Sequence, residues 1–279
     1  MRVKKVIGKK VVFVIAVMLL ILTVVRNGSF GYAAEEEILY IPQASGQNVI
    51  EKNGCRLDAS NIQNGYFMIS YDGPQENIKM IITDPYGKQK RSVIEKGKNC
   101  SFPLNEGNGT YRVEVQDLFY TELQVSVEDR NSPYLYANTY VSYDKDSECV
   151  KKAEQLRKKS FSKKNFVNKV ISYVSENTEY DQTFADSDPV NYIPDPDRTF
   201  LSGKGICSDY ASLTAAMLRS QDIPVKMQFG YAGNEYHAWV EVYLDGQWIT
   251  YDPTLQHGNS DESVQEYMEE VGYSVSETY

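Results

Sequence analysis

The sequence predicts an α+β protein in which a small β-sandwich module precedes a domain of helices packed on an antiparallel sheet. Short segments with strand-like alternation, separated by turn residues, fill the chain from Ile38 to about Asp129. After Asn131-Ser132-Pro133 helical segments come first and strands later, an order typical of α+β domains. We therefore expect four parts: an N-terminal segment (1–34), a β module (35–131), a helix-and-sheet domain (132–257) and an acidic tail (258–279).

The first 34 residues have the order of a secretory signal peptide. Five of the first ten residues are basic, the 15-residue run Val11–Val25 holds one threonine among apolar residues, and small residues end the segment at Ala33-Ala34. A comfortable membrane span needs about 20 apolar residues, which makes an uncleaved anchor the weaker alternative. We expect a secreted or cell-surface protein that meets a membrane only through this segment, if the segment stays uncleaved.

Charge excludes one class of partner. The chain has a net charge of −9, and residues 1–34 contain six basic and no acidic side chains, so the remaining 23 basic and 38 acidic residues give −15. Nucleic-acid binding depends on neutralising phosphates with Lys and Arg. We therefore expect no nucleic-acid partner.

Four cysteines, Cys55, Cys100, Cys149 and Cys207, follow the N-terminal segment. An oxidising compartment permits disulfides, and Cys55 and Cys100 lie in the same predicted module. Sequence alone does not give their separation in space, so whether they pair stays open. We expect Cys149 to be a packing residue rather than a reactive thiol.

The β module shows strand patterns but no catalytic cluster. Its strand-like segments include 66–71, 78–83 and 111–115, and turn sequences rich in Gly, Asp, Asn and Pro separate them. Several short strands at this spacing predict a small sandwich. We expect a spacer or adhesion unit, since a fold by itself implies no activity.

The second domain combines helical and strand-like patterns. Helical spacing predicts helices over 147–159, 166–174 and 211–220, with Ser162 as an N-cap of the second. A loop rich in Pro and Asp spans 186–197. Strand-like runs follow at 225–229, 237–243 and 247–252.

Cys207 is a candidate nucleophile. Gly203 and Gly205 precede it, and a helical pattern begins at or just after it. At a helix start, unpaired backbone N–H groups and the helix dipole favour negative charge and hence the reactive thiolate. The same N–H groups are suited to stabilising an oxyanion. A buried structural cysteine is the alternative.

His237 and Asp252 are candidates for a base and for the residue that orients it. His237, one of two histidines, begins an alternating strand and can accept a proton near neutral pH. Asp252 ends the next strand, just before Pro253. Because Asp245-Gly246 predicts a hairpin turn between the two strands, their far ends should meet, and the carboxylate would fix the histidine tautomer. Taken singly, a hydrogen-bonded structural histidine and a turn-capping aspartate are the alternatives.

Three segments in order resemble the transglutaminase-like superfamily of papain-like enzymes. They are GICSDYA (205–211), YHAWVEV (236–242) and WITYDPT (248–254), which correspond to the family's cysteine helix, histidine strand and aspartate strand. The resemblance is strong from Lys204 to Thr254 and extends weakly back to about Ser147. Tyr180-Asp181, Arg198-Thr199-Phe200 and the N-terminal β region are also similar to features of exported bacterial members.

The resemblance implies that Cys207 is the nucleophile, His237 the base and Asp252 the orienting carboxylate, on a cysteine-bearing helix packed against an antiparallel sheet. The calcium-dependent animal cross-linking enzymes of the family carry an upstream tryptophan near the oxyanion. Both tryptophans of this chain, Trp239 and Trp248, follow Cys207. We therefore do not extend the oxyanion chemistry or the calcium dependence of those animal enzymes to this chain.

Other polar and aromatic residues near the three segments have expected places. Tyr210 and Tyr236, like Asp209, flank the candidate triad and could line a substrate cleft or serve in packing. His257 lies in a polar segment and should be solvated. No second ligand stands at a spacing suited to zinc, so we expect no metal and no other cofactor. The tail from Gly258 has six acidic and no basic residues, and either forms a short helix over 262–270 or is disordered.

The leading hypothesis is an exported cysteine enzyme that performs acyl transfer on peptide or amide bonds. Hydrolysis needs only water, whereas transfer needs an amine site for which the sequence has no marker, so we favour a peptidase or amidase. The substrate would be a peptide or protein, with cell-wall peptides suggested by location. The alternatives are a cross-linking glutamine transferase and a catalytically silent surface binding module.

Overall fold

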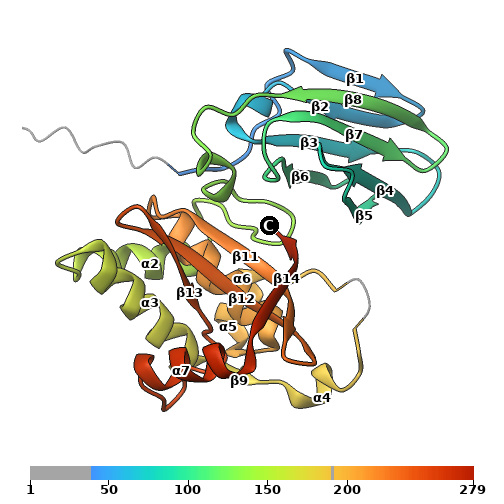
Figure 1. Ribbon diagram of the computed structural model, residues 1–279. Coiled ribbons are helices and arrows are strands. Elements are labelled where there is room, and N and C mark those ends of the chain that lie inside the picture. The colour runs from blue at the N-terminus through green and yellow to red at the C-terminus, as the bar shows by residue number, and fades with distance from the viewer. Residues whose placement is uncertain (1–38, 190–191) are drawn as a thin grey trace, which may run out of the picture. The chain divides into compact units, whose positions relative to one another are not determined.

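Figure 1 shows the computed structural model, which describes residues 39–189 and 192–279. The signal peptide predicted over 1–34 lies outside the described residues. Within the described part, no helix has the length and apolar character needed to cross a membrane. Contacts between residues group Leu39–Tyr279 into one compact unit.

The N-terminal module consists of two antiparallel sheets, with strand orders β1-β2-β3-β6 and β5-β4-β7-β8. Strands β3, β4 and β7 confirm the three predicted strand segments. The bounds are β1 (Val49–Lys52), β2 (Cys55–Asp58), β3 (Tyr66–Tyr71), β4 (Asn77–Thr83), β5 (Gln89–Glu95), β6 (Asn99–Pro103), β7 (Gly109–Val115) and β8 (Phe119–Val125). Single 3₁₀ turns lie at Ile62–Asn64 and Ser132–Tyr134.

The two sheets share one hydrophobic core. Leu57 and Phe67 of the first sheet are fully buried in the same cluster as Met80 and Val113 of the second. Burying each such side chain stabilises the folded state by about 1.5–3 kcal/mol, so this shared face holds the module together.

The question of a Cys55–Cys100 disulfide is answered by the strand order. Cys55 lies on β2 and Cys100 on β6, and β3 lies between these strands. Two strand spacings of about 4.8 Å place the two backbones beyond the reach of a disulfide. Both cysteines are free, as is Cys149, which is fully buried as a packing residue.

The second domain contains the three predicted helices: α2 (Glu148–Lys158), α3 (Lys163–Asn177) and α6 (Cys207–Arg219). The predicted N-cap is confirmed, because the Ser162 hydroxyl accepts a hydrogen bond from the Asn165 N–H at 3.1 Å. The region between α3 and α6 holds elements that the sequence did not predict. They are β9 (Glu179–Tyr180), α4 (Gln182–Ala185), α5 (Pro196–Ser202) and β10 (Lys204–Gly205).

The antiparallel sheet of this domain has the order β13-β12-β11-β14. Its bounds are β11 (Val225–Ala232), β12 (Glu235–Leu244), β13 (Gln247–Tyr251) and β14 (Tyr273–Thr278). Helix α6 packs against β11 and β12 (Figure 1), and its buried residues join theirs in one core. The predicted hairpin is confirmed: Leu244 pairs with Gln247, and Asp245 and Gly246 have φ of 51° and 87°, as a type I′ turn requires.

The acidic tail predicted over 258–279 is part of this domain. The expected helix is present as α7 (Asp261–Val271), but β14 was not foreseen and forms the edge strand beside β11. The close approach of β14 to β11 depends on Gly230, where an added Cβ would lie 1.9 Å from the Ser274 carbonyl oxygen. A glycine in a strand interior often marks such an approach of another backbone.

Arg219, at the end of α6, is fully buried and holds three distant segments together. Its guanidinium donates to the carbonyl oxygens of Val225 at 2.9 Å, Tyr136 at 2.8 Å and Tyr279 at 2.7 Å. Burial lowers the pKa of Arg219 to about 10, which leaves the group charged at neutral pH. A buried charge is tolerated only when hydrogen bonds satisfy it, as these carbonyls do.

Candidate active site

Cys207 is the first residue of α6, as the sequence predicted for a thiol at a helix start. The helix end is fixed by Asp209, whose carboxylate accepts a hydrogen bond from the Ile206 N–H at 2.9 Å. Gly205 makes room for this cap, since an added Cβ would lie 2.5 Å from the Asp209 Cβ. The N–H groups of the first turn therefore point out of the helix beside the thiol.

Asp209 is a structural anchor and not a cleft residue, which corrects one of the two expectations for it. Its side chain is 1% exposed and accepts hydrogen bonds from the hydroxyls of Tyr192 at 2.6 Å and Thr199 at 3.3 Å. Arg198 lies 3.5 Å away as an ion-pair partner. The carboxylate thus ties the segment before Cys207 to the helix that begins with it.

The structure brings the three predicted triad residues together. His237 Nε2 lies 2.6 Å from Asp252 Oδ2, and the Cys207 side chain interacts with the same ring and raises its pKa. Because Nε2 faces the carboxylate, Nδ1 is the ring atom left for the sulfur. The His237 side chain is 16% exposed and that of Asp252 is 0% exposed, so the pair lies behind the thiol and away from solvent.

The environment of His237 favours the imidazolium. Burial of the ring lowers its pKa, but hydrogen bonds with Asp252 and Cys207 outweigh burial and raise the pKa of His237 to about 10. Negative charge beside the ring, above all that of Asp252, favours the charged form of His237. The imidazole is therefore held as imidazolium at neutral pH.

Asp252 has further hydrogen-bond donors. Its Oδ1 accepts from the Thr254 N–H at 3.0 Å, and its Oδ2 accepts from the Tyr273 hydroxyl at 2.7 Å. Tyr273 also packs edge-on against Trp239, with ring centroids 4.9 Å apart. Burial and the neighbouring Asp252 raise the pKa of Tyr273, so it stays a donor. Sequence reasoning missed Tyr273, because its strand was taken for part of a tail.

A cleft of about 430 Å³ opens in front of Cys207. Aromatic rings dominate its wall: Tyr140, Tyr180, Tyr192, Phe229, Tyr236 and Tyr279. Tyr236 is 62% exposed and lines this cleft. Tyr210 does not line it and has the packing role of its two alternatives: this residue is 4% exposed, and its hydroxyl donates to the Thr178 carbonyl, because its position on α6 faces inward. His257 is exposed, as expected.

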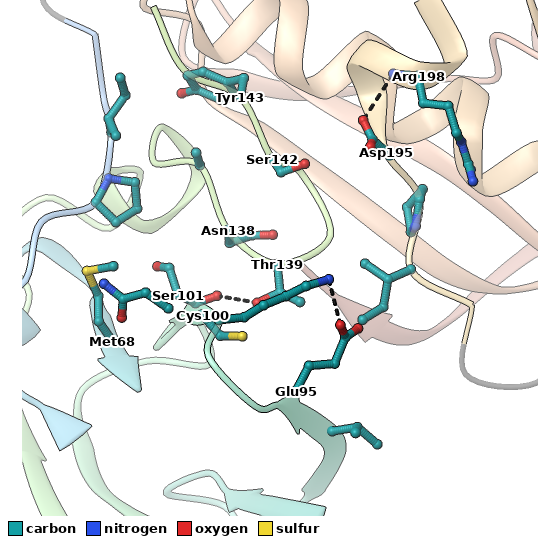
Figure 2. A pocket seen from close by; sticks show the side chains of 18 residues that line it. Met68, Glu95, Cys100, Ser101, Asn138, Thr139, Ser142, Tyr143, Asp195 and Arg198 are labelled. Atoms are coloured by element: carbon teal, nitrogen blue, oxygen red, sulfur yellow. Dashed lines mark hydrogen bonds and ion pairs between the residues drawn. The ribbon is translucent and has the colours of Figure 1, made fainter. Parts of the chain in front are cut away.

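A larger cavity of about 490 Å³ lies elsewhere and contains none of the three triad residues (Figure 2). Its wall includes Cys100 and Ser101 on one side and Asp195 and Arg198 on another. The Thr139 N–H donates a hydrogen bond to the Ser101 carbonyl at 3.0 Å, so these two polar groups of the cavity wall are paired with each other. Across the described residues, no group of three or more His, Cys, Asp or Glu side chains is arranged to hold a metal ion.

Comparison with known proteins finds a family match for part of the chain. Residues 150–253 match the family described as the transglutaminase-like superfamily. A curated relative, an uncharacterized protein of Mycobacterium leprae (strain TN), is 32% identical over 84 residues, which cover 23% of this chain and 30% of the relative. The chain thus spans less than a third of that relative's length.

Two solved structures are similar at low identity. A candidate cysteine protease from Cytophaga hutchinsonii has a TM-score of 0.41 and 18% identity, over 68% of this chain and 71% of that chain. The periplasmic domain of TgpA from Pseudomonas aeruginosa has a TM-score of 0.37 and 17% identity, over 83% of this chain and 81% of that chain.

Proposed function

Residues 150–253 belong to the transglutaminase-like superfamily of cysteine-type enzymes, and from this premise we propose that the chain performs acyl transfer with Cys207 as nucleophile. His237 acts as the base and Asp252 as the carboxylate that orients it. One observation supports this above all: the Cys207 thiol, at a helix start facing a cleft, interacts with an imidazole that is itself hydrogen-bonded to a buried carboxylate.

In the first half of the reaction, His237 takes the proton of Cys207. The thiolate sulfur attacks the carbonyl carbon of an amide, and the π electron pair moves to the carbonyl oxygen. When that pair returns, the C–N bond breaks, His237 gives its proton to the leaving nitrogen, and a thioester remains. Asp252 holds the ring in the tautomer and orientation that serve both transfers.

Hydrolysis completes the reaction most simply. Water attacks the thioester, His237 accepts a proton from it, and the thiolate leaves with the carboxylic acid released. We propose a peptidase or amidase on this ground, because water needs no dedicated acceptor site. The proposal that the protein is exported rests on the order of basic, apolar and small residues in 1–34. An exported enzyme would meet extracytoplasmic peptides, including cell-wall peptides, and these are the proposed substrates.

The proposal is tested by incubating the protein with a peptide library and a labelled amine, with Cys207→Ala as the control. We expect cleavage that depends on Cys207, without amine incorporation. Incorporation of the amine would instead identify a cross-linking transferase. A wild-type protein that matches Cys207→Ala in both assays would leave only a surface binding module.

Thiol reactivity provides a second test that needs no substrate. Iodoacetamide should alkylate Cys207 rapidly at about pH 6, and His237→Ala should slow this reaction, because the thiolate loses its imidazolium partner. Mass spectrometry separates Cys207 from Cys100, which is also partly accessible. Equal alkylation rates in both proteins would contradict the proposed pair.

A further inference from the structure

Tyr180 is held beside the nucleophile by a short parallel pair of strands. β9 and β10 pair Tyr180 with Gly205, two residues before Cys207. The Glu179 N–H donates to the Gly203 carbonyl at 2.8 Å, and the Asp181 N–H donates to the Gly205 carbonyl at 2.9 Å. The backbone of Tyr180 is thus bonded on both sides to the segment that leads into α6.

The side chain of Tyr180 is also fixed. Its ring lies 6.3 Å from that of Tyr210, measured between centroids, and Tyr210 donates its own hydroxyl to the Thr178 carbonyl. Tyr210 therefore anchors both the ring and the backbone of the segment that carries Tyr180. The Tyr180 ring remains 37% exposed and lines the same cleft as Cys207.

Tyr180 and Cys207 line the same cleft, and the Cys207 backbone N–H interacts with the Tyr180 hydroxyl, an effect that by itself lowers the pKa of Tyr180. Burial raises the pKa of Tyr180 by more, and the charge of the neighbouring Cys207 adds to the rise, so the phenol keeps its proton at neutral pH. A neutral phenol can both accept and donate a hydrogen bond. The Tyr180 hydroxyl therefore has a proton to donate to an oxygen that enters the cleft beside the Cys207 N–H.

The proposed reaction creates a need for such donors. Attack by the Cys207 sulfur moves an electron pair onto the carbonyl oxygen, and fixed donors around that oxygen usually supply the largest single stabilisation of the transition state. The N–H of Cys207, at the open end of α6, is one donor. Trp239 is buried against His237 and Tyr273, and neither tryptophan lines the cleft, whereas Tyr180 does and can supply a side-chain donor.

We propose that the Tyr180 hydroxyl and the Cys207 backbone N–H together form the oxyanion hole. This assignment rests on the proposed function and gives Tyr180 a catalytic role within it. As the sulfur–carbon bond forms, the carbonyl oxygen takes the position between the two donors and accepts both hydrogen bonds. When the leaving group departs, the electron pair returns and the two donors resume their contact.

The test compares two reactions of the same thiol. p-Nitrophenyl acetate acylates Cys207 through an oxyanion and releases p-nitrophenolate, whereas iodoacetamide alkylates the sulfur with loss of iodide and forms no oxyanion. In Tyr180→Phe we expect acylation to slow by about 10²-fold, the loss typical of one oxyanion donor, with alkylation unchanged. Tyr231→Phe, which removes the hydroxyl of another exposed tyrosine in the domain, should leave both rates unchanged.

The outcomes separate this assignment from the proposed function. Suppose that both reagents modify the wild-type protein faster than Cys207→Ala, and that Tyr180→Phe reacts at the wild-type rates. The assignment of Tyr180 to the oxyanion hole is then overturned, and the proposed function stands. Equal slowing of both reactions would also overturn it, because Tyr180 would then act on the thiolate. If wild-type protein shows no reaction at Cys207 at all, the function itself fails.

Discussion

Each predicted member of the triad is positioned by interactions that a different part of the chain supplies. Cys207 owes its place to a helix cap, His237 to a strand and Asp252 to a hairpin end. These local signals are readable in sequence, which is why the sequence could predict that these three residues lie close together. Tyr273 could not be predicted, because its contact with Asp252 joins residues 21 positions apart through a strand with weak patterning.

Tyr273→Phe tests the tyrosine as a positioning residue. The change removes one hydrogen bond to a buried charged carboxylate, an interaction of about 1.5–3 kcal/mol, and frees Asp252 to turn away from His237. We expect kcat for p-nitrophenyl acetate to fall about tenfold with KM unchanged. Tyr267→Phe on α7, where the side chain is 47% exposed, is the matched control. A change in KM alone would contradict a positioning role.

At the scale of elements, the sequence pattern predicted the longer helices and three strands of the sheet, and it missed the short elements and one edge strand. Helices α2, α3 and α6 and strands β11, β12 and β13 were all expected, because their apolar spacing is regular. The short pieces α4, α5, β9 and β10 were not, because their form depends on tertiary contacts such as those of Asp209. The edge strand β14 pairs on one side only, and its acidic sequence was taken for a solvated tail.

Gly230→Ala tests how β14 is held. The added Cβ would collide with the Ser274 carbonyl, so the strand must shift and carry Tyr273 away from Asp252. We expect a loss of about 1–3 kcal/mol in the free energy of unfolding, measured with urea, and slower acylation of Cys207. Gly258→Ala, where nothing lies within 4 Å of the new Cβ, reports the cost of positive φ alone. Unchanged acylation in Gly230→Ala would show that β14 does not position the site.

At the scale of the whole molecule, the α+β class and the transglutaminase-like domain follow from sequence, whereas the disulfide question needed the strand order. The sequence also could not show how strongly folding depends on the buried site. His237 and Asp252 are both largely removed from solvent, so any ionisation there is linked to global stability.

The pH dependence of stability follows from His237. Its pKa is raised from an ordinary 6.5 to about 10, so the imidazolium contributes stability that is complete below pH 6.5 and is lost as pH rises toward 10. The difference in free energy of unfolding between wild type and His237→Asn should therefore shrink over this range, as followed by urea titration. His257→Asn, which removes the exposed histidine, is the control. A difference that is constant or grows with pH would refute the ion pair.

The buried Arg219 has a consequence for how the protein is made. During translation the guanidinium and two of its acceptors, at Tyr136 and Val225, are available well before Tyr279 is added. Until then Arg219 is short of one acceptor, and Tyr273 has no strand to bring it to Asp252. Docking of β14 should therefore complete the hydrogen bonds of Arg219 and of Asp252 together, so a chain cut before β14 should lose both contacts and react slowly at Cys207.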